Sequence, residues 1–364
     1  MSLHLTRRVL LPLGIAASVS ACGGGGSSGP PPPNPLYVNA ATGSDTNAGD
    51  QANPLASVSK AAQVALSAYQ IIVAPGIYQG GITTNRQGKV PQGVQFIADT
   101  SGDKTGTTAG PVTIDATGLG AGFNLSSSSA AAGNIKAMID GFTITNASDA
   151  GIVIKSGSDD LVIQNCMIHD NPGDGIRVQD SARVLVFNNL VYDNGGDGIA
   201  LVGPKSGSPS GRLYNNTIVR NDGHGITIGT TDHASPGAWV LNNIVQDNDA
   251  TLPSENMKAF TSPSSQSKYN GNCNLVFLAT YNPSYLQGPD DVASAALFVN
   301  PPTDFHLLSS SPAIDRSDMN NCALAGLGPS QENILLGRTT TGTNSSPGVA
   351  DKKPYDLGFH FLRH

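Results

Sequence analysis

Two long cationic side chains lie where they could act on one anionic group. Lys155 and Arg177 are 22 residues apart, about one period of a repeat in the middle of the chain. Such groups can neutralise a carboxylate, or take a proton when nearby positive charge favours their neutral form. His224, a third group that transfers protons, lies further along the repeats. We take these three as candidate catalytic residues; the alternative is that Lys155 and Arg177 are solvated residues on an outward sheet face.

Three aspartates recur near one turn of the same repeats. Asp149, Asp174 and Asp197 occupy adjacent repeats, and His224 follows in the column of Asp174 and Asp197. Calcium takes several hard oxygen ligands such as carboxylates. The three aspartates are therefore candidate metal ligands, with Ca²⁺ as the expected cofactor. Aspartates also stabilise turns without any metal, and that interpretation stays open.

Aromatic residues mark a third candidate surface. Phe187 and Tyr214 align on adjacent repeats, and we expect Trp239 to face outward on the next. Flat apolar rings can stack on sugars, so these are candidate substrate-binding residues. The insertions 203–211 and 229–237 follow the same strand of successive repeats. They would wall one edge of a groove, unless they are filler loops.

The composition excludes several other classes of protein. A net charge of -7, with 20 Lys and Arg spread thinly, offers no basic stripe for nucleic acid. The chain has no His-Glu-x-x-His and no paired Cys-x-x-Cys, so a zinc site has little support. Only two of the 27 acidic residues are glutamate, and 43 glycines and 24 prolines favour turns over helices.

The repeat is marked twice in each period. The segment Asn171-Pro172-Gly173-Asp174-Gly175-Ile176 returns at 194–199 and 221–226, and the glycine before isoleucine falls at 175, 198 and 225. Asparagines at 165, 188 and 215 each precede one of these loops by six residues. Between the markers, residues alternate with period two, which indicates about three short strands per repeat. Segments this short cannot bury a face alone, whereas coils stacked ~4.8 Å apart share one core.

We therefore predict an all-β chain whose residues 36–300 form a single parallel β-helix. Asn189, Asn216 and Asn243 fall where turn side chains can point inward and hydrogen-bond to one another, with Cys166 as the odd member of that column. The Ala-rich segment 54–66 predicts a helix that caps the N-terminal end of the stack, and residues 301–364 form the expected C-terminal capping segment.

Several motifs resemble one family. The opening Leu36-Tyr37-Val38-Asn39, the segment 43–49 and the strand 72–78 are similar to the start of bacterial right-handed β-helix proteins of the pectate-lyase-like superfamily. The segments Phe305-His306-Leu307, 311–315 and 356–358 resemble the closing part of the same exported proteins. The resemblance covers about residues 36–358 and implies a right-handed helix. It says less about activity, because one fold hosts many functions.

The resemblance implies acidic glycans as substrates and β-elimination as the chemistry. In that reaction a cation neutralises a uronate carboxylate, and a nearby base takes the adjacent proton. Alginate- and chondroitin-type lyases place Lys and Arg on neighbouring coils, and Ile154-Lys155-Ser156 resembles their lysine segment. Counting along the repeats aligns Lys155 with Gln179 and Arg177 with Val153. The Cα atoms of Lys155 and Arg177 should then be about 8 Å apart.

The calcium expectation has a similar origin. The family nine pectate lyases carry an Asp-Asp-Gly-Phe-Asp coil that binds Ca²⁺. The corresponding coil here, Gly173-Asp174-Gly175-Ile176-Arg177, keeps one carboxylate, loses another and replaces the third with a cation.

The N-terminus predicts export. Residues 1–21 have a basic start, an apolar run and small residues, as in a secretory signal. The segment Val19-Ser20-Ala21-Cys22 resembles the bacterial lipobox, which implies acylation of Cys22 after cleavage; a cleaved signal with an unmodified cysteine is the alternative. Residues 22–35 form a Gly/Pro-rich tether. Export also permits a disulfide, for which Cys273 and Cys322 are the candidate pair.

Two functions follow from these observations. The first is a monomeric lipoprotein, anchored at the outer membrane or cell surface through its lipid only, that binds an acidic polysaccharide and cleaves it if the lyase residues are active. The second is a non-catalytic surface or adhesion module, which the altered lyase motifs favour. The sequence leaves the glycan, the cleavage chemistry and the ion open.

Overall fold

A computed structural model describes most of the chain after residue 33. The described residues are 34–83, 93–125, 137–155, 161–179, 183–202, 210–229, 237–249, 256–259, 269–277, 281–282, 284–316, 338–343, 346–347 and 356–362. The predicted signal segment, Cys22, Cys322 and most of the two insertions lie outside these ranges. Residues 32–364 form one compact unit, to which everything below refers. Among the described helices, none is long and apolar enough to cross a membrane.

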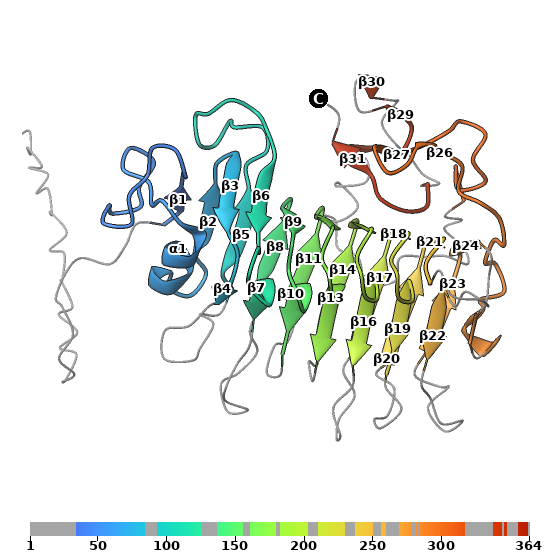
Figure 1. The fold of residues 1–364 in the computed structure, drawn as a ribbon. Coiled ribbons are helices and arrows are strands. Elements are labelled where there is room, and N and C mark those ends of the chain that lie inside the picture. Colours follow the sequence, from blue (N-terminus) through green and yellow to red (C-terminus); the bar gives the residue numbers. More distant parts are fainter. Residues whose placement is uncertain are drawn as a thin grey trace, which may run out of the picture. The chain divides into compact units, whose positions relative to one another are not determined.

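Three parallel sheets run side by side through the stack (Figure 1). Sheet A contains β1 (Leu36–Val38), β2 (Gln70–Val73), β5 (Gln95–Ala98), β8 (Met138–Asp140), β11 (Leu161–Gln164), β14 (Arg183–Phe187), β17 (Ser210–Tyr214), β20 (Gly237–Leu241) and β23 (Tyr269–Asn272). Sheet B contains β3 (Gly76–Gln79), β6 (Val112–Asp115), β9 (Thr143–Thr145), β12 (Met167–His169), β15 (Leu190–Tyr192), β18 (Thr217–Val219), β21 (Ile244–Gln246) and β24 (Leu275–Phe277). Sheet C contains β4 (Ile82–Thr83), β7 (Ala121–Leu125), β10 (Ala150–Ile154), β13 (Asp174–Gln179), β16 (Ile199–Val202), β19 (Ile226–Ile228), β22 (Met257–Ala259) and β25 (Tyr281–Asn282).

The register of sheet C confirms the predicted stacking. Ile152 pairs with Ile176, Ile176 with Ile199, and Ile199 with Ile226. All four side chains are fully buried. Each coil therefore adds one isoleucine to the same interior column, and the apolar surface that one coil leaves open is covered by the next.

An asparagine ladder lines the interior corner between sheets A and B, as predicted. The side-chain oxygen of Asn216 accepts from the backbone and amide nitrogens of Asn189, at 3.0 Å each. Asn243 does the same for Asn216, and the ladder begins at the backbone N–H of Cys166. It continues to Asn274 and ends on the carboxylate of Asp291. Each amide satisfies backbone groups that no water could reach.

A second ladder, which the sequence did not predict, lines the corner between sheets B and C. In each member, a buried asparagine side-chain oxygen accepts a hydrogen bond from a backbone N–H that precedes it in the stack. The members are Asn171, Asn194, Asn221, Asn248 and Asn256. In both corners a residue of positive φ precedes the ladder asparagine, for example Asn188 at 54° and Asp193 at 50°. Asn and Asp adopt this left-handed conformation more readily than other non-glycine residues.

The two ends of the stack are covered differently. The helix α1 (Val58–Val64) packs against β1, β2 and β4 at the N-terminal end, and the Ser57 hydroxyl caps it by accepting from the Lys60 N–H at 3.1 Å. The C-terminal segment pairs β26 (Phe298–Asn300) with β27 (Asp304–Leu307), β28 (Arg338–Thr339) with β31 (Phe361–Leu362), and β29 (Gly342–Thr343) with β30 (Ser346–Pro347), after the short 3-10 helix η2 (Ser284–Leu286).

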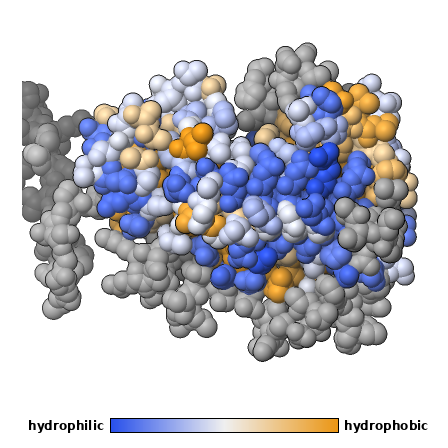
Figure 2. Space-filling view, viewed as in Figure 1, coloured by the Kyte–Doolittle hydropathy of each residue, from blue (hydrophilic) through white to orange (hydrophobic). Residues whose placement is uncertain are grey.

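This C-terminal segment lies over the outer face of sheet B. Phe305, Phe359 and Phe361 bury the outward side chains of Leu190 and Val219. Figure 2 shows a hydrophilic surface over the middle coils, with hydrophobic side chains gathered towards the C-terminal segment at the upper right. Cys273 is disulfide-bonded. Cys166 is fully buried, and burial raises the pKa of its thiol to about 12, which fits an unreactive filler.

The first ladder should dominate the stability of the stack. In Asn216→Ala, the backbone N–H of Asn189 and the carbonyl of Val186 lose their partners. We expect a loss of about 3 kcal/mol in the free energy of unfolding, because buried polar groups without partners are costly. Urea denaturation followed by circular dichroism measures it. Asn270→Ala, at an exposed position of sheet A, is the control and should change the free energy of unfolding by no more than about 0.5 kcal/mol.

Candidate functional site

A cleft of about 610 Å³ lies at the outer corner between sheets A and B. One wall is the loop after β5, which contributes Lys104 and Pro111, and the opposite wall is the C-terminal segment, which contributes Arg338 and Phe361. Asp140 belongs to the coils between these walls. The volume of the cleft is that of a typical ligand-binding pocket. In Figure 1 the loop and β31 rise on the same side of the coils.

The coils supply a fixed carboxylate to the cleft. Asp140 is the last residue of β8, and its two oxygens accept from Asn165 Nδ2 at 2.6 Å and Gln164 Nε2 at 3.0 Å. The following residue, Gly141, has a φ of 84° and turns the chain into sheet B. Asn165 has a φ of 58° at the equivalent turn of the next coil. Two left-handed turns on adjacent coils therefore hold the Asp140 carboxylate in one orientation.

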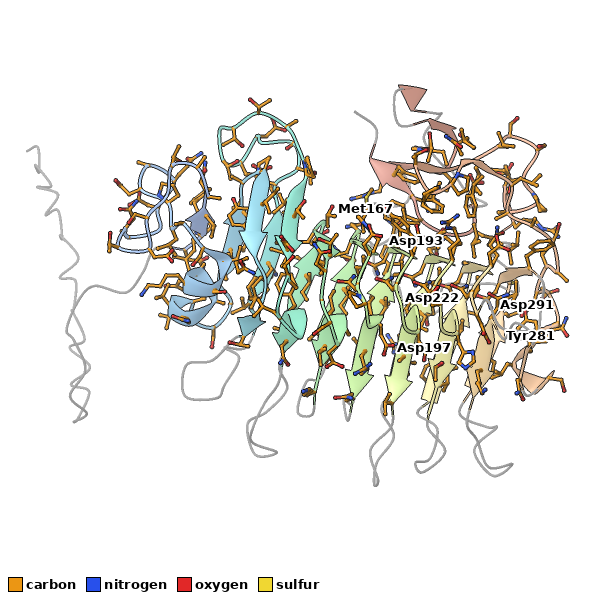
Figure 3. The ribbon with its side chains drawn as sticks, in the orientation of Figure 1. Met167, Asp193, Asp197, Asp222, Tyr281 and Asp291 are labelled. Carbon is orange, nitrogen blue, oxygen red and sulfur yellow. The ribbon has the colours of Figure 1, made fainter. Side chains whose placement is uncertain are left out.

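The C-terminal segment supplies a cation and an aromatic wall. The Arg338 guanidinium donates to the carbonyl of His360 at 3.3 Å. The His306 ring stacks on Phe361 with 3.7 Å between centroids, and its Nδ1 lies 2.7 Å from a carboxylate oxygen of Asp304. Met167, labelled in Figure 3, lies beneath this segment on β12 and also lines the cleft.

Positively charged side chains outnumber carboxylates in the cleft. Burial lowers the pKa of Arg338 to about 10, although the nearby Asp140 carboxylate opposes this effect. Within the described ranges, no carboxylate forms an ion pair with Arg338. Lys104 adds a second cation on the facing wall. The cleft therefore combines two cations and one carboxylate with mainly apolar surroundings, which suits an anionic ligand with apolar faces.

The cations predicted from sequence lie elsewhere, on sheet C. Val153 pairs with Arg177, so Lys155, which directly follows β10, lies two residues further along the chain than the neighbour of Arg177, as the repeat count indicates. The Arg177 guanidinium forms ion pairs with Asp149 and with Asp174, the latter at 2.7 Å. Burial lowers the pKa of Arg177, but these two pairs outweigh it and hold the pKa above its usual value. A base must release its proton, so this arrangement favours an electrostatic or structural role. The catalytic assignment of Lys155, Arg177 and His224 stays a prediction.

The three predicted calcium ligands do lie on adjacent coils. Asp174 accepts from the backbone N–H of Asp197, and Asp197 accepts from that of His224, at 2.8 Å each. The carboxylates thus stabilise turns, and Arg177 bridges Asp149 and Asp174. Among the described residues, no group of three His, Cys, Asp or Glu side chains could hold a metal ion. A guanidinium between two carboxylates does not fit a calcium ion, so no chemical step here is assigned to one.

The predicted aromatic residues are brought together, with less exposure than expected. Phe187 pairs with Tyr214, but both are fully buried and cluster with Leu241. Trp239 pairs with Arg212, two positions from that column along each strand, and the Arg212 guanidinium lies 5.9 Å from the Trp239 ring centroid. As placed here, Phe187 and Tyr214 offer no open ring face to a sugar. The groove wall expected from the two insertions lies outside the described residues.

Sequence reasoning missed the cleft because its residues come from distant parts of the chain. Asp140 and Asn165 belong to the repeats, whereas Lys104 precedes them and Arg338 follows them. One signal was present: His306 and its neighbours belong to the closing segment that resembles the pectate-lyase-like proteins. The sequence predicts a cap for that segment, and nothing in the sequence indicates that it folds back along the coils.

A family-model comparison agrees with the fold. A family model described as a right handed beta helix region matches residues 101–273. No curated protein matches the chain. The pectate lyase Pel9A is similar in structure at 15% identity, over 91% of this chain and 97% of that one, with a TM-score of 0.47. A rhamnogalacturonan lyase is similar at 12% identity, over 74% and 91%, with a TM-score of 0.32. The A-module of the mannuronan C-5 epimerase AlgE4 of Azotobacter vinelandii is similar at 13% identity, over 62% and 91%, with a TM-score of 0.26.

The three stacked parallel sheets, with the family match over residues 101–273, show that the chain folds as a right-handed parallel β-helix with an N-terminal capping helix, as the sequence predicted. The structural likenesses are too distant to assign an activity.

Because Arg177 forms these ion pairs, we expect the loss of folding stability on its removal to depend on pH. Burial already raises the pKa of Asp174 above its unfolded value, and in Arg177→Gln the carboxyl loses its cation, which raises that pKa further. An acid with a raised folded-state pKa favours folding while protonated and loses that contribution as pH rises through the folded-state pKa. We expect the variant to be about 2 kcal/mol less stable than the parent at pH 7, and much closer to it near pH 4.

Thermal unfolding of both proteins across this pH range measures the difference. The double variant Asp174→Asn, Arg177→Gln is the control, because it removes the titrating group and should show a cost that changes little with pH. A cost of Arg177→Gln that is equal at both pH values would contradict the assignment.

Proposed function

We propose that the cleft binds an acidic polysaccharide, with Arg338 neutralising one of its carboxylates. The observation that carries this proposal is the guanidinium of Arg338, which is largely buried, is lowered in pKa by that burial and has no carboxylate partner among the described residues. A charge removed from water is costly unless it is paired. A carboxylate ligand would supply that partner, and the guanidinium fork matches its geometry.

The remaining lining of the cleft suits a sugar chain. Phe361, Met167 and Pro111 give apolar surface, on which the flat faces of pyranose rings can rest. Lys104 faces Arg338 from the opposite wall and extends the positive charge along the cleft. An anionic polymer with one carboxylate per sugar fits two cations separated in this way better than a small neutral ligand does.

The same cleft has a group for proton transfer. Among the described residues that line it, Asp140 is the carboxylate. If the bound glycan is cleaved by β-elimination, Arg338 would neutralise the uronate carboxylate and Asp140 would accept the proton from the adjacent carbon. The electron pair of that C–H bond would form the new C=C bond as the glycosidic C–O bond breaks, and the leaving oxygen would take a proton from water. The hydrogen bonds from Gln164 and Asn165 keep the Asp140 carboxylate oriented. Lys155 and Arg177 on sheet C would then take no part in the chemistry.

A second candidate is a non-catalytic surface module. The observation that favours it is that Arg177, one of the lyase-like residues, is held in ion pairs with Asp149 and Asp174. This module would use the cleft for attachment to the glycan without cleaving it.

Removing the charge of the cleft should remove glycan binding. We expect Arg338→Gln to weaken binding of the preferred acidic glycan at least about tenfold, and Lys104→Gln to weaken it less, because hydrogen bonds between charged groups contribute about 1.5 kcal/mol or more. Isothermal titration with pectate, alginate and chondroitin sulfate, in Ca²⁺ and in EDTA, measures the affinities. Arg316→Gln, at an exposed position outside the cleft, is the control. Since Arg338→Gln could disturb folding, Lys104→Gln tests the contribution of positive charge to binding at an exposed position of the cleft.

Incubating the protein with the same three glycans separates the two functions. Ultraviolet absorbance of unsaturated sugars reports β-elimination, and Asp140→Asn should abolish it while binding is retained. Binding without new absorbance supports the surface module. Unchanged affinity in both Arg338→Gln and Lys104→Gln would refute the cleft as the binding site.

We also propose that the protein is a lipoprotein anchored through Cys22. The support is the sequence Val19-Ser20-Ala21-Cys22 after an apolar run, followed by a glycine- and proline-rich tether. An anchored protein of this kind is suited to holding an extracellular glycan close to the cell.

The anchor has a direct test. The Cys22→Ser variant should lose its acylation site and leave the membrane fraction, because a single covalent anchor is the only attachment proposed. Immunoblots of separated membrane and soluble fractions measure this, with Cys166→Ser as the control. Membrane association that persists in Cys22→Ser would exclude the anchor.

A further inference from the structure

A row of left-handed asparagines continues the cleft along the outer corner between sheets A and B. Asn165, Asn188, Asn215 and Asn242 occupy the same turn of successive coils and have φ values from 52° to 60°. Asn165 lines the cleft. Its side-chain oxygen accepts from Asn188 Nδ2 at 2.8 Å, so the first two members are joined directly. The corner that forms the floor of the cleft therefore extends past it, coil after coil.

Residues 356–360, here called the C-terminal strap, cover this row beyond the cleft. The strap runs from the coil of Asn242 to that of Asn188, and Phe361 then forms part of the cleft wall. Its contacts with the corner are main-chain hydrogen bonds: Gly358 N to Asn242 O at 3.0 Å, Phe359 N to Thr217 Oγ1 at 2.9 Å, His360 N to Asn188 Oδ1 at 2.6 Å, Asn188 Nδ2 to His360 O at 3.2 Å, and Asn215 Nδ2 to Asp356 O at 3.2 Å.

Some side-chain polar atoms of the row have no hydrogen-bond partner beneath the strap. The Oδ1 and Nδ2 atoms of Asn242, and the Oδ1 atom of Asn215, are buried without any hydrogen-bond partner. Both residues are fully buried. The ladder that begins between Asn165 and Asn188 is interrupted where His360 N takes the Asn188 oxygen. Buried polar atoms without partners are rare in folded proteins, and each one calls for an explanation.

We propose that Asn188, Asn215 and Asn242 form a second stretch of the glycan-binding track, which the strap covers until a long glycan displaces it. This inference rests on the proposed function of the cleft. Side-chain amides offer one acceptor and one donor group each, and sugar hydroxyls both donate and accept. A chain of sugars lying along the corner would satisfy the atoms that the strap leaves without partners. The strap then acts as an internal competitor for this stretch, and short glycans that fill only the cleft leave it in place.

Hydrogen–deuterium exchange of the strap amides tests this proposal. Trisaccharides and dodecasaccharides from pectate, alginate and chondroitin are added to the full chain, and exchange at Gly358, Phe359 and His360 is followed by mass spectrometry. We expect the long oligomer that binds to raise exchange at these amides and the matching trisaccharide to leave it unchanged. Strap amides that stay protected with a bound dodecasaccharide would overturn the proposal.

Weakening the strap supplies a second measurement. Thr217→Val removes the hydroxyl that holds Phe359 N and keeps the shape of the side chain. It should tighten binding of the dodecasaccharide about three- to tenfold, because less of the protein is held in the covered state, and leave trisaccharide affinity unchanged. Thr227→Val is the matched control: Thr227 is also buried, lies in sheet C, and its hydroxyl has no partner.

The outcomes separate the two proposals. If no oligomer binds the parent protein, the proposed function fails and this inference fails with it. If both oligomers bind, but Thr217→Val leaves both affinities as they were and the strap stays protected, the cleft binds glycan and the strap is only a structural cover.

Discussion

The structure depends on satisfying buried polar groups at the corners of the coils. Every coil must turn sharply between sheets, and each turn places amide and carbonyl groups in the interior, where an unpaired group is costly. Asparagine solves this problem because its side chain accepts from one coil while it donates to another, as Asn216 does between Asn189 and Asn243. Residues of positive φ set up each corner, and the isoleucine columns then stack behind them.

The regularity of the corners explains why the cleft lies outside the core. A turn that repeats on successive coils presents its outward residues in a row, spaced as closely as the strands themselves. Asp140 and Asn165 are two members of such rows, and they gain a special environment only where the loop after β5 and the C-terminal segment stand on either side of them. The cleft is thus a local break in a repetitive surface, and its cations come from the irregular parts of the chain.

The C-terminal segment has two roles that are connected physically. It buries the outward apolar side chains of sheet B, including Leu190 and Val219, through Phe305, Phe359 and Phe361. The same placement brings Arg338 into the cleft and lays the strap over the asparagine row. Apolar contacts hold the segment in place, whereas its contacts with the row are hydrogen bonds that a polar ligand can replace. The wall of the cleft and the cover of the asparagine row are therefore one element.

The sequence by itself determined the architecture, because its information is periodic. The spacing of Gly175, Gly198 and Gly225, with alternating apolar residues between, allows little else than stacked coils, and it predicted the ladder of Asn189, Asn216 and Asn243. It also placed Val153 beside Arg177. It did not show that Arg177 would be neutralised by Asp149 and Asp174, or that Phe187 and Tyr214 would be buried, because those outcomes depend on which side chains meet across coils. Only the tertiary structure decided the cleft, since Asp140 and Arg338 meet through the path of an aperiodic segment that no repeat encodes.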